Sequence, residues 1–445
     1  MRHAHPTRHR PAALAAVLLV WLIVFAAQRA ATAATAATAA TAATAATAAT
    51  AATAATASTT STADAPHRAF VPLTAGKAAF SATPLPGRFN QVTAITHAGD
   101  DRLFVAEREG RIKIIHPDGR ATVFLDIRHR VISDRGEYGF YDVAFHPGYS
   151  DPASPGFGFF YVSFTSGTDG RAAGDAPAVD VDLIVSRFRV SANPDTADGN
   201  SEVILIAEPQ TDDIHKGGSM EFDPRDNRLY VGIGDDFKNL VAQDPTSIKG
   251  KIVRLTVDDV GRDAPHGQPA AVGLEIWASG LRNPWRLDVD WVGNQLLIGE
   301  VGDADWEEVN RASLGAPGAN FGWPCLEGPL VKPAFANAPA CQNPERFTRP
   351  IHAYSHRDAD NNRCVVIGGK VNRPAHNPTD GRFIFADFCT REVFALGLDV
   401  DGTWRRGLLA VVGDFPINTI GEDRYGYQYV GTAAESGPIY QLYIP

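Results

Sequence analysis

The sequence predicts an all-β protein, a six-bladed β-propeller built from four-stranded antiparallel blades. One strand pattern, rich in aromatic and β-branched residues, recurs six times along the chain. A further strand follows most of the copies, as expected for consecutive antiparallel groups. The composition of 41 glycines, 30 prolines and two methionines indicates a turn-rich β-protein rather than a helical bundle.

The copies of the repeated strand share an aromatic or aliphatic run that often ends in Gly, Asp or Glu, and they lie at 102–107, 159–164, 228–233, 295–300, 382–387 and 427–432. Three copies follow a strand that ends in a Pro or Asp turn, at 143–147, 220–224 and 287–290. Trailing strands are expected at 110–115, 183–188, 251–255, 393–396 and 439–442. Uneven spacing predicts long insertions on one face. A two-sheet sandwich is the runner-up, but about 370 residues of strands exceed one sandwich.

The N-terminus is expected to be a targeting segment. Residues 1–33 combine three arginines before the apolar run, at 2, 8 and 10, the run itself from Pro11 to Ala27 and a stretch of small residues, the pattern of a secretory signal peptide. The run is near the length of a membrane span, so an uncleaved anchor is the alternative. The protein is therefore predicted to be exported, periplasmic or extracellular, with membrane attachment only through this segment.

Residues 34–66 are dominated by an Ala-Ala-Thr repeat that carries no charge until its last few residues and cannot build a core, so they are predicted to be a disordered tether. The propeller domain is placed at 67–445. The net charge of −10 argues against a nucleic-acid partner, which would favour a basic face.

Four cysteines and an export signal favour two disulfides over a metal site, because no Cys-x-x-Cys is present. Four cysteines allow three pairings. Sequence order suggests Cys325–Cys341 and Cys364–Cys389, each of which closes a local loop.

Candidate chemistry lies where loops enter and leave the repeated strands, since propellers bind ligands where these loops converge. His215 precedes one strand pair and Asp235 ends it, so a carboxylate could orient an imidazole base. The alternative is a surface histidine beside an acidic turn. Arg282 and Asn283 enter the next blade and offer planar donors and a restricted Asn-Pro backbone; a solvated arginine in a turn is the alternative.

The acidic loop from Glu300 to Asn310 suits calcium by its oxygen content, although it lacks EF-hand spacing and could equally be a solvated turn. Several other sites are unsupported. No Gly-x-Gly-x-x-Gly opens a helix after a strand, the segment from Gly234 to Phe237 contains no phosphate-loop lysine, and no Gly-x-Ser-x-Gly elbow occurs.

From about Ala79 onward the chain resembles the glucose/sorbosone dehydrogenase family of six-bladed propellers. Besides the His215 and Asp235 unit and the acidic loop, the matching motifs are 139–147, 250–255, 280–284 and 320–324. The family includes aldose dehydrogenases that use pyrroloquinoline quinone (PQQ) and calcium, and hedgehog-interacting-protein-like members that need not be enzymes.

The resemblance implies a role for each matching residue. His215 would be the base that takes the sugar hydroxyl proton as hydride moves to the quinone, and Asp235 would support it. Arg282 and Asn283 would contact cofactor and substrate. The backbone carbonyls of Gly302 and Asp303 would hold calcium.

The chain also departs from the family pattern. A cofactor-binding glutamine falls at Glu137, a cofactor lysine at Cys389, and two arginines near Pro416 and Asn418. PQQ carries three carboxylates, so losing these cations should weaken its binding, unless Arg391 compensates.

Two functions are therefore expected. The first is PQQ- and calcium-dependent oxidation of an aldose sugar, passing electrons to an external acceptor. The second is a non-catalytic secreted propeller that binds a ligand or protein partner. A calcium-dependent hydrolase is a third reading with no specific support.

Overall fold

The computed structural model describes residues 80–167, 181–356 and 362–445. The predicted signal peptide, the tether and residues 67–79 of the predicted domain lie outside this range. Nearly all regular structure is β-strand. The helical segments in the described part are short 3₁₀ turns, η1 (Asn239–Gln243), η2 (Val257–Asp259), η3 (Pro333–Phe335), η4 (Pro339–Cys341) and η5 (Pro344–Arg346). None of the described helices is long and apolar enough to cross a membrane.

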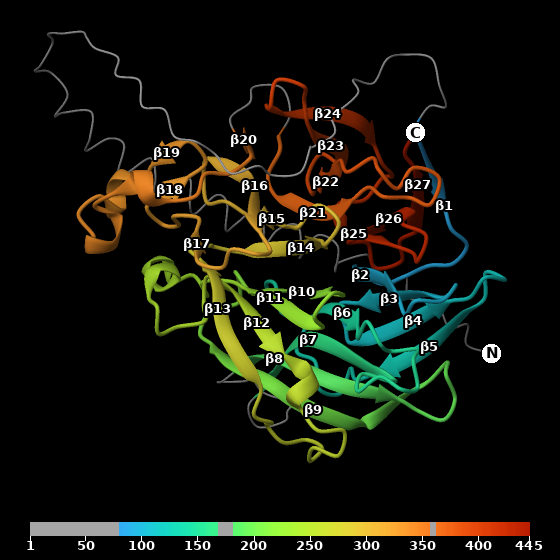
Figure 1. Cartoon of the computed structure of the whole chain (residues 1–445). Helices are drawn as coiled ribbons and strands as arrows, with labels where there is room; N and C mark the ends of the chain where they lie inside the picture. The colour runs from blue at the N-terminus through green and yellow to red at the C-terminus, as the bar shows by residue number, and fades with distance from the viewer. Residues whose placement is uncertain (1–79, 168–180, 357–361) are drawn as a thin grey trace, which may run out of the picture. The chain divides into compact units, whose positions relative to one another are not determined.

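Six antiparallel sheets form the blades of a propeller (Figure 1). Blade 1 contains β2 (Val92–His97), β3 (Leu103–Glu107), β4 (Arg111–Ile115) and β5 (Ala121–Asp126). Blade 2 contains β6 (Phe140–Phe145), β7 (Phe159–Gly167), β8 (Val181–Val190) and β9 (Ala197–Gln210). Blade 3 contains β10 (Gly217–Asp223), β11 (Arg228–Ile233), β12 (Lys251–Thr256) and β13 (Gly273–Ser279).

Blade 4 contains β14 (Pro284–Asp290), β15 (Gln295–Glu300), β16 (Trp306–Ser313) and β20 (His352–Ser355). Blade 5 contains β21 (Val366–Val371), β22 (Phe383–Asp387), β23 (Glu392–Leu398) and β24 (Trp404–Val411). Blade 6 contains β25 (Ile417–Glu422), β26 (Gln428–Thr432) and β27 (Ile439–Tyr443), with β1 (Ser81–Pro84) as its outer strand.

The first strands of the blades close a ring. Strands β2, β6, β10, β14, β21 and β25 contact one another in this order, and β25 contacts β2. Strand β1 pairs antiparallel with β27, with Ser81 opposite Tyr443 and Pro84 opposite Tyr440. The N-terminal strand therefore completes the last blade and joins the two ends of the described chain in one sheet.

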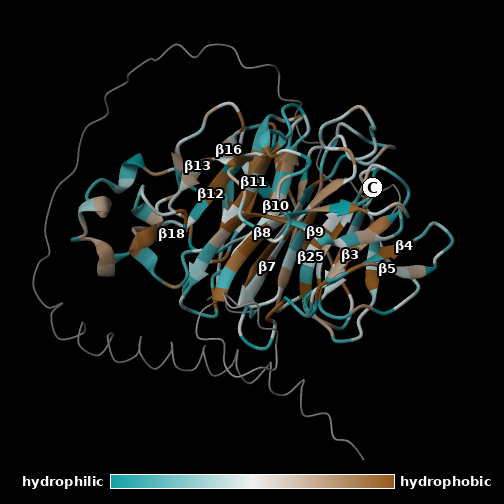
Figure 2. Ribbon diagram, turned by 90° about the horizontal axis from the view of Figure 1, so that it is seen from below, coloured by the Kyte–Doolittle hydropathy of each residue, from teal (hydrophilic) through white to brown (hydrophobic). Residues whose placement is uncertain are grey.

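The predicted fold is confirmed. The repeated pattern marks the second strand of every blade, β3, β7, β11, β15, β22 and β26. The trailing strands are the third strands β4, β8, β12, β23 and β27. Hydrophobic residues concentrate on the strands and hydrophilic residues on the connecting loops (Figure 2).

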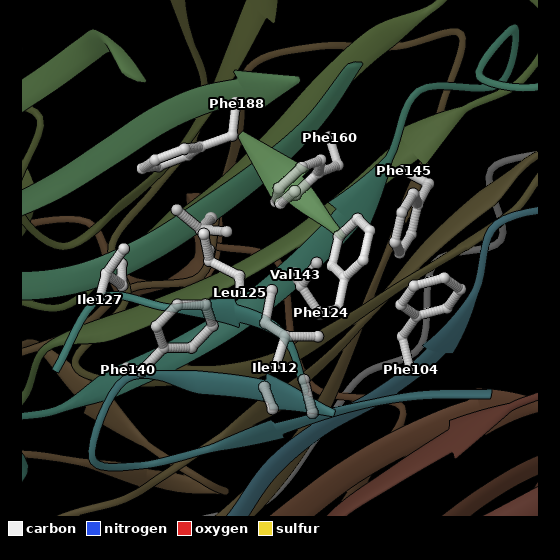
Figure 3. Close-up of a cluster of buried hydrophobic side chains, with 14 of the residues drawn as sticks. Phe104, Ile112, Phe124, Leu125, Ile127, Phe140, Val143, Phe145, Phe160 and Phe188 are labelled. Atoms are coloured by element: carbon white, nitrogen blue, oxygen red, sulfur yellow. The ribbon is translucent and has the colours of Figure 1, made fainter. Parts of the chain in front are cut away.

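The core lies between neighbouring blades. Figure 3 shows side chains of blade 1 packed against blade 2, with the rings of Phe104 and Phe145 4.4 Å apart and those of Phe124 and Phe160 5.0 Å apart. Burying one such side chain contributes about 1.5–3 kcal/mol. Blade-to-blade packing therefore holds the ring in shape and fixes where the connecting loops meet.

A long insertion leaves blade 4 between β16 and β20. It contains β17 (Ala319–Asn320), which pairs parallel with β13, and the small hairpin of β18 (Leu326–Glu327) and β19 (Leu330–Val331). The disulfide Cys325–Cys341 closes a loop within it, and Cys364–Cys389 links the start of blade 5 to its second hairpin. Both suggested pairings are confirmed.

Candidate active site

His215 and Asp235 meet because of strand pairing. His215 lies two residues before β10 and Asp235 two residues after β11, and these strands are antiparallel with Gly217 opposite Ile233. Nδ1 of His215 lies 2.7 Å from Oδ1 of Asp235. The two residues are 3% and 0% exposed. The predicted pairing of these two side chains is therefore present in the structure.

The backbone around this pair has unusual geometry. His215, Asp236 and Phe237 all adopt left-handed conformations, with φ of 57°, 55° and 59°. Such values are uncommon outside glycine and cluster at functional sites. One consequence is local: the backbone N–H of Phe237 turns back and donates to Oδ1 of Asp235 at 2.9 Å.

The second oxygen of Asp235 is also held. Nε1 of Trp323 donates to Oδ2 of Asp235 at 2.8 Å. Asp235 accepts from the N–H groups of Phe237 and Trp323, as an ionised carboxylate does. Because an ionised carboxylate can only accept, Nδ1 of His215 is the donor in the His215–Asp235 contact. The imidazole then carries its lone pair on Nε2, and no hydrogen bond to that atom is seen within the described residues.

An aromatic side chain flanks the histidine. The ring of Phe237 meets the imidazole edge to face with centroids 5.3 Å apart, and Phe237 is 46% exposed. A large apolar side chain left half-exposed beside a buried imidazole is a suitable surface for the apolar face of a ligand.

Asn283 and Glu137 lie next to the His215 loop. Oδ1 of Asn283 accepts from the backbone N–H of Gly217 at 2.9 Å, and its Nδ2 donates to Oε1 of Glu137 at 3.1 Å. Glu137 also accepts from the backbone N–H of Lys216 at 2.9 Å. Both predicted residues therefore belong to the same cluster as His215, and their polar groups brace the loop that carries it.

Arg282 lies beside Trp323 and the acidic loop. Its Nη1 donates to the carbonyl of Val301 at 3.3 Å, its Nη2 lies 3.5 Å from Oδ1 of Asp303, and its guanidinium carbon sits 5.6 Å from the Trp323 ring centroid. Glu300 accepts from the backbone N–H groups of Arg282 and Asn283 at 2.5 and 3.0 Å. Burial, together with nearby Glu308, raises the pKa of Glu300 well above its usual range.

The carboxylates of the acidic loop are occupied by internal donors. Oε1 of Glu327 accepts from the backbone N–H groups of Asp303, Asp305 and Trp306. Lys332 lies 3.0 Å from Asp303 and 2.5 Å from Glu327. Although burial opposes it, Arg282 and Lys332 lower the pKa of Asp303. Among the described residues no three His, Cys, Asp or Glu side chains are arranged to hold a metal ion.

A small cavity lies behind Arg282. It has a volume of about 10 Å³ and is lined by Arg282, Glu300, Glu308, Glu327 and Trp323 among others. Nε of Arg282 and Oε2 of Glu300 have no hydrogen-bond partner within the described part of the chain. This volume is close to that of one buried water molecule.

Sequence reasoning missed a buried charge network under the site. Asp236 accepts from Lys216 at 2.6 Å and from Lys249 at 2.7 Å. It also accepts from the backbone N–H groups of Thr211 and Asp212. Burial lowers the pKa of Lys216, and the two lysines outweigh burial in lowering that of Asp236. Only the Asp-Asp pair at 235–236 hinted at this network.

Trp323 and Lys332 were missed as site residues as well. Trp323 was part of a motif that matched the family, but neither residue had an assigned role. Both lie on the blade 4 insertion, whose path the repeat does not encode.

The positions that depart from the family pattern bring no free cation. Cys389 is bonded to Cys364, Nδ2 of Asn418 donates to the carbonyl of Val92 at 2.8 Å, and Pro416 carries no charge. Nη1 of Arg391 donates to the carbonyl of Gly413 at 2.7 Å. Cys389, Pro416 and Asn418 therefore supply no positive charge of their own.

Known proteins share both sequence and fold with this chain. HIPL2 protein of Arabidopsis thaliana is 27% identical over 366 residues, 67% of this chain and 50% of that protein. Hedgehog-interacting protein of Mus musculus is 30% identical over 220 residues, 45% of this chain and 30% of that protein. The chain thus spans half or less of the length of these curated relatives.

A structural relative has the same architecture. The PQQ-bound form of aldose sugar dehydrogenase from Streptomyces coelicolor matches with a TM-score of 0.59 and 21% identity, covering 83% of this chain and 99% of that one. At this identity the likeness shows the fold alone. The profile of the Glucose / Sorbosone dehydrogenase family matches residues 89–441, and the chain belongs to that family.

Proposed function

We propose that this protein oxidises a hydroxyl group of an aldose sugar, with His215 as the base. The observation that carries the proposal is the Asp235–His215 contact of 2.7 Å, in which Nδ1 is engaged and Nε2 of the imidazole has no hydrogen-bond partner among the described residues. An imidazole held in one tautomer by a buried carboxylate is an arrangement suited to taking a proton near neutral pH.

In the proposed step, Nε2 of His215 takes the hydroxyl proton while the carbon that bears the hydroxyl loses its hydrogen as hydride. The sugar becomes a lactone or carbonyl product, and a two-electron acceptor receives the hydride. The imidazolium that forms is stabilised by Asp235. Arg282 and Asn283 are proposed to position the reactants, and the exposed ring of Phe237 to pack against the sugar.

PQQ, the hydride acceptor implied by the family, supplies quinone redox chemistry when bound and carries three carboxylates. The residues of this structure fit it poorly. Cys389 is in a disulfide, Asn418 donates to a backbone carbonyl, and Glu137 adds a negative charge beside His215. We therefore derive no step through PQQ, and its use remains part of the proposal to be tested.

Calcium binding by the backbone carbonyls of Gly302 and Asp303 is likewise part of the proposal to be tested. Arg282 and Lys332 already neutralise the Asp303 side chain, and Glu327 is used to bind N–H groups of the loop. Any calcium here would depend on main-chain carbonyls rather than on carboxylates.

A second function, binding without catalysis, is supported by the positions that depart from the family pattern. A propeller of this family that keeps the histidine pair but lacks a cationic clamp could bind a ligand or protein partner without turnover. One relative is named for interaction with Hedgehog, and that property belongs to that protein. Export of this chain and passage of its electrons to an external acceptor are likewise proposals.

Reconstitution separates the two functions. The full chain, with both disulfides formed, is mixed with PQQ and calcium, and dye reduction is followed across a panel of aldoses. PQQ binding is measured separately by calorimetry. The control variant is His215→Asn, because asparagine tolerates the left-handed backbone at φ 57° better than most residues.

Saturable dye reduction that disappears in the variant is the expected result. If the folded protein binds PQQ but oxidises none of the aldoses, the proposed oxidation is wrong. Folded protein that neither binds PQQ nor reduces dye with any added acceptor would favour the binding function.

A further inference from the structure

Trp323 reaches the histidine pair from a different part of the chain. It lies on the blade 4 insertion, is 5% exposed, and donates from Nε1 to Oδ2 of Asp235 at 2.8 Å. The two oxygens of Asp235 thus serve different partners. Oδ1 faces His215 and the backbone N–H of Phe237, and Oδ2 faces the indole.

Several contacts fix the indole in this orientation. The backbone N–H of Trp323 donates to the carbonyl of Gly280 at 2.9 Å, and its own carbonyl accepts from Nε2 of Gln243 at 2.7 Å. The charged ends of Arg282 and Lys332 each lie 5.6 Å from the ring centroid. These cation–π contacts and main-chain bonds leave the indole little freedom to move.

We propose that Trp323 is a positioning residue for His215, acting through Asp235. This inference rests on the proposed function, in which His215 is the base. With Oδ2 engaged by the indole, the carboxylate plane is set and Oδ1 stays directed at Nδ1. Without the indole N–H, Oδ2 would be buried and unpaired, and the carboxylate could turn to seek another donor.

The positioning effect is separable from the bulk of the side chain. Trp277 provides a matched comparison, since it is 0% exposed and its Nε1 has no hydrogen-bond partner among the described residues. Replacing either indole by phenyl removes similar apolar volume. Only the replacement at 323 removes a donor to Asp235.

The experiment compares Trp323→Phe and Trp277→Phe in the full chain labelled with ¹⁵N-histidine. The ring nitrogen signals of His215 are assigned by their loss in His215→Asn. They report whether Nδ1 or Nε2 carries the proton, so this readout works without turnover and holds even if the proposed oxidation fails. Dye reduction with the best aldose is measured in parallel.

In the unmodified protein we expect His215 to show a protonated Nδ1 and an unprotonated Nε2. In Trp323→Phe we expect a mixture of tautomers and a loss of kcat of at least about tenfold, whereas Trp277→Phe keeps the unmodified pattern. A pure Nδ1–H tautomer in folded Trp323→Phe would overturn the proposal.

Loss of fold in Trp323→Phe would be resolved by placing β-(3-benzothienyl)alanine at 323. This residue keeps the bicyclic shape and lacks only the N–H group. The same mixture of tautomers is expected there, and an unchanged tautomer would again refute the positioning role.

Discussion

The adjacent carboxylates of Asp235 and Asp236 belong to two separate networks. Asp235 accepts from His215 and Trp323, whereas Asp236 accepts from the ammonium groups of Lys216 and Lys249. The backbone at Asp236 is left-handed, with φ of 55°. The first network bears on chemistry and the second on stability. The same substitution should therefore lower activity at Asp235 and lower the stability of the fold at Asp236.

Asp235→Asn should abolish activity and spare the fold. The amide keeps the shape of the carboxylate but removes its charge and replaces one acceptor oxygen by an N–H donor, so it can no longer accept from His215, Phe237 and Trp323 together and select the Nδ1–H tautomer. We expect kcat to fall by roughly 10⁴-fold, as for the same substitution in the His–Asp pair of serine proteases. Dye-reduction kinetics check this, and a loss smaller than tenfold would contradict the role of Asp235.

Asp236→Asn should instead destabilise the protein. Lys216 and Asp236 are 0% exposed at the side chain and Lys249 is 7% exposed, so the substitution leaves the ammonium of Lys216 without its anion and Lys249 with Glu208 at 3.8 Å. Removing one partner of a buried ion pair costs about 3–5 kcal/mol. The asparagine tolerates the left-handed backbone, which removes strain as an explanation.

Urea unfolding followed by tryptophan fluorescence measures this effect. The control is Asp401→Asn, which breaks an exposed ion pair with Arg405 and should leave the unfolding midpoint unchanged. A midpoint for Asp236→Asn equal to that of the unmodified protein would show that the lysine network does not support the fold.

Phe237→Leu should affect substrate binding more than the chemical step. The phenyl ring flanks His215 at 5.3 Å and is 46% exposed, and leucine keeps apolar bulk without the flat face. Loss of an aromatic stacking contact of about 0.5–1.5 kcal/mol corresponds to a rise in KM of about two- to tenfold with kcat nearly unchanged. A fall in kcat with constant KM would instead show that Phe237 makes its contact only in the transition state.

The fold followed from the sequence because one strand of each blade carries a strong signal. The second strands are almost fully buried, so their aromatic and β-branched residues form continuous runs, as in β22 (Phe383–Asp387). Strand β1 (Ser81–Pro84) escaped prediction because it is a mostly exposed outer strand without such a run. Its position depends on pairing with β27, which lies at the other end of the chain.

The site was predictable only where the repeat fixes geometry. His215 and Asp235 flank two antiparallel strands, so their proximity follows from the hairpin. Trp323 and Lys332 arrive on an insertion, whose course is set by its own disulfide and tertiary contacts. No pattern around Lys216 predicted its complete burial, which depends on Asp236 and Gln210.

Glu308 should make the stability of the protein depend on pH. Burial raises the pKa of Glu308 from 4.5 to about 7 in the folded state. Between these values the folded state holds a proton that the unfolded state has released, so stability falls as pH rises. The loss of unfolding free energy caused by ionising Glu308 is absent below pH 4.5 and complete above pH 7, where it reaches about 3 kcal/mol.

Glu308→Gln should remove this dependence. The oxygen of the uncharged amide can still accept from the backbone N–H of Gly328. The Oδ1 atom of Asn310 has no partner within the described residues, so the Asn310 side chain can turn and accept from the new amide N–H. The variant should match the unmodified protein at pH 4.5 and be more stable by up to about 3 kcal/mol at pH 8, as measured by urea unfolding. Glu345→Gln, an exposed site on the blade 4 insertion that follows β16, serves as control. A difference between variant and unmodified protein that stays constant from pH 4.5 to 8 would show that Glu308 does not titrate in this range.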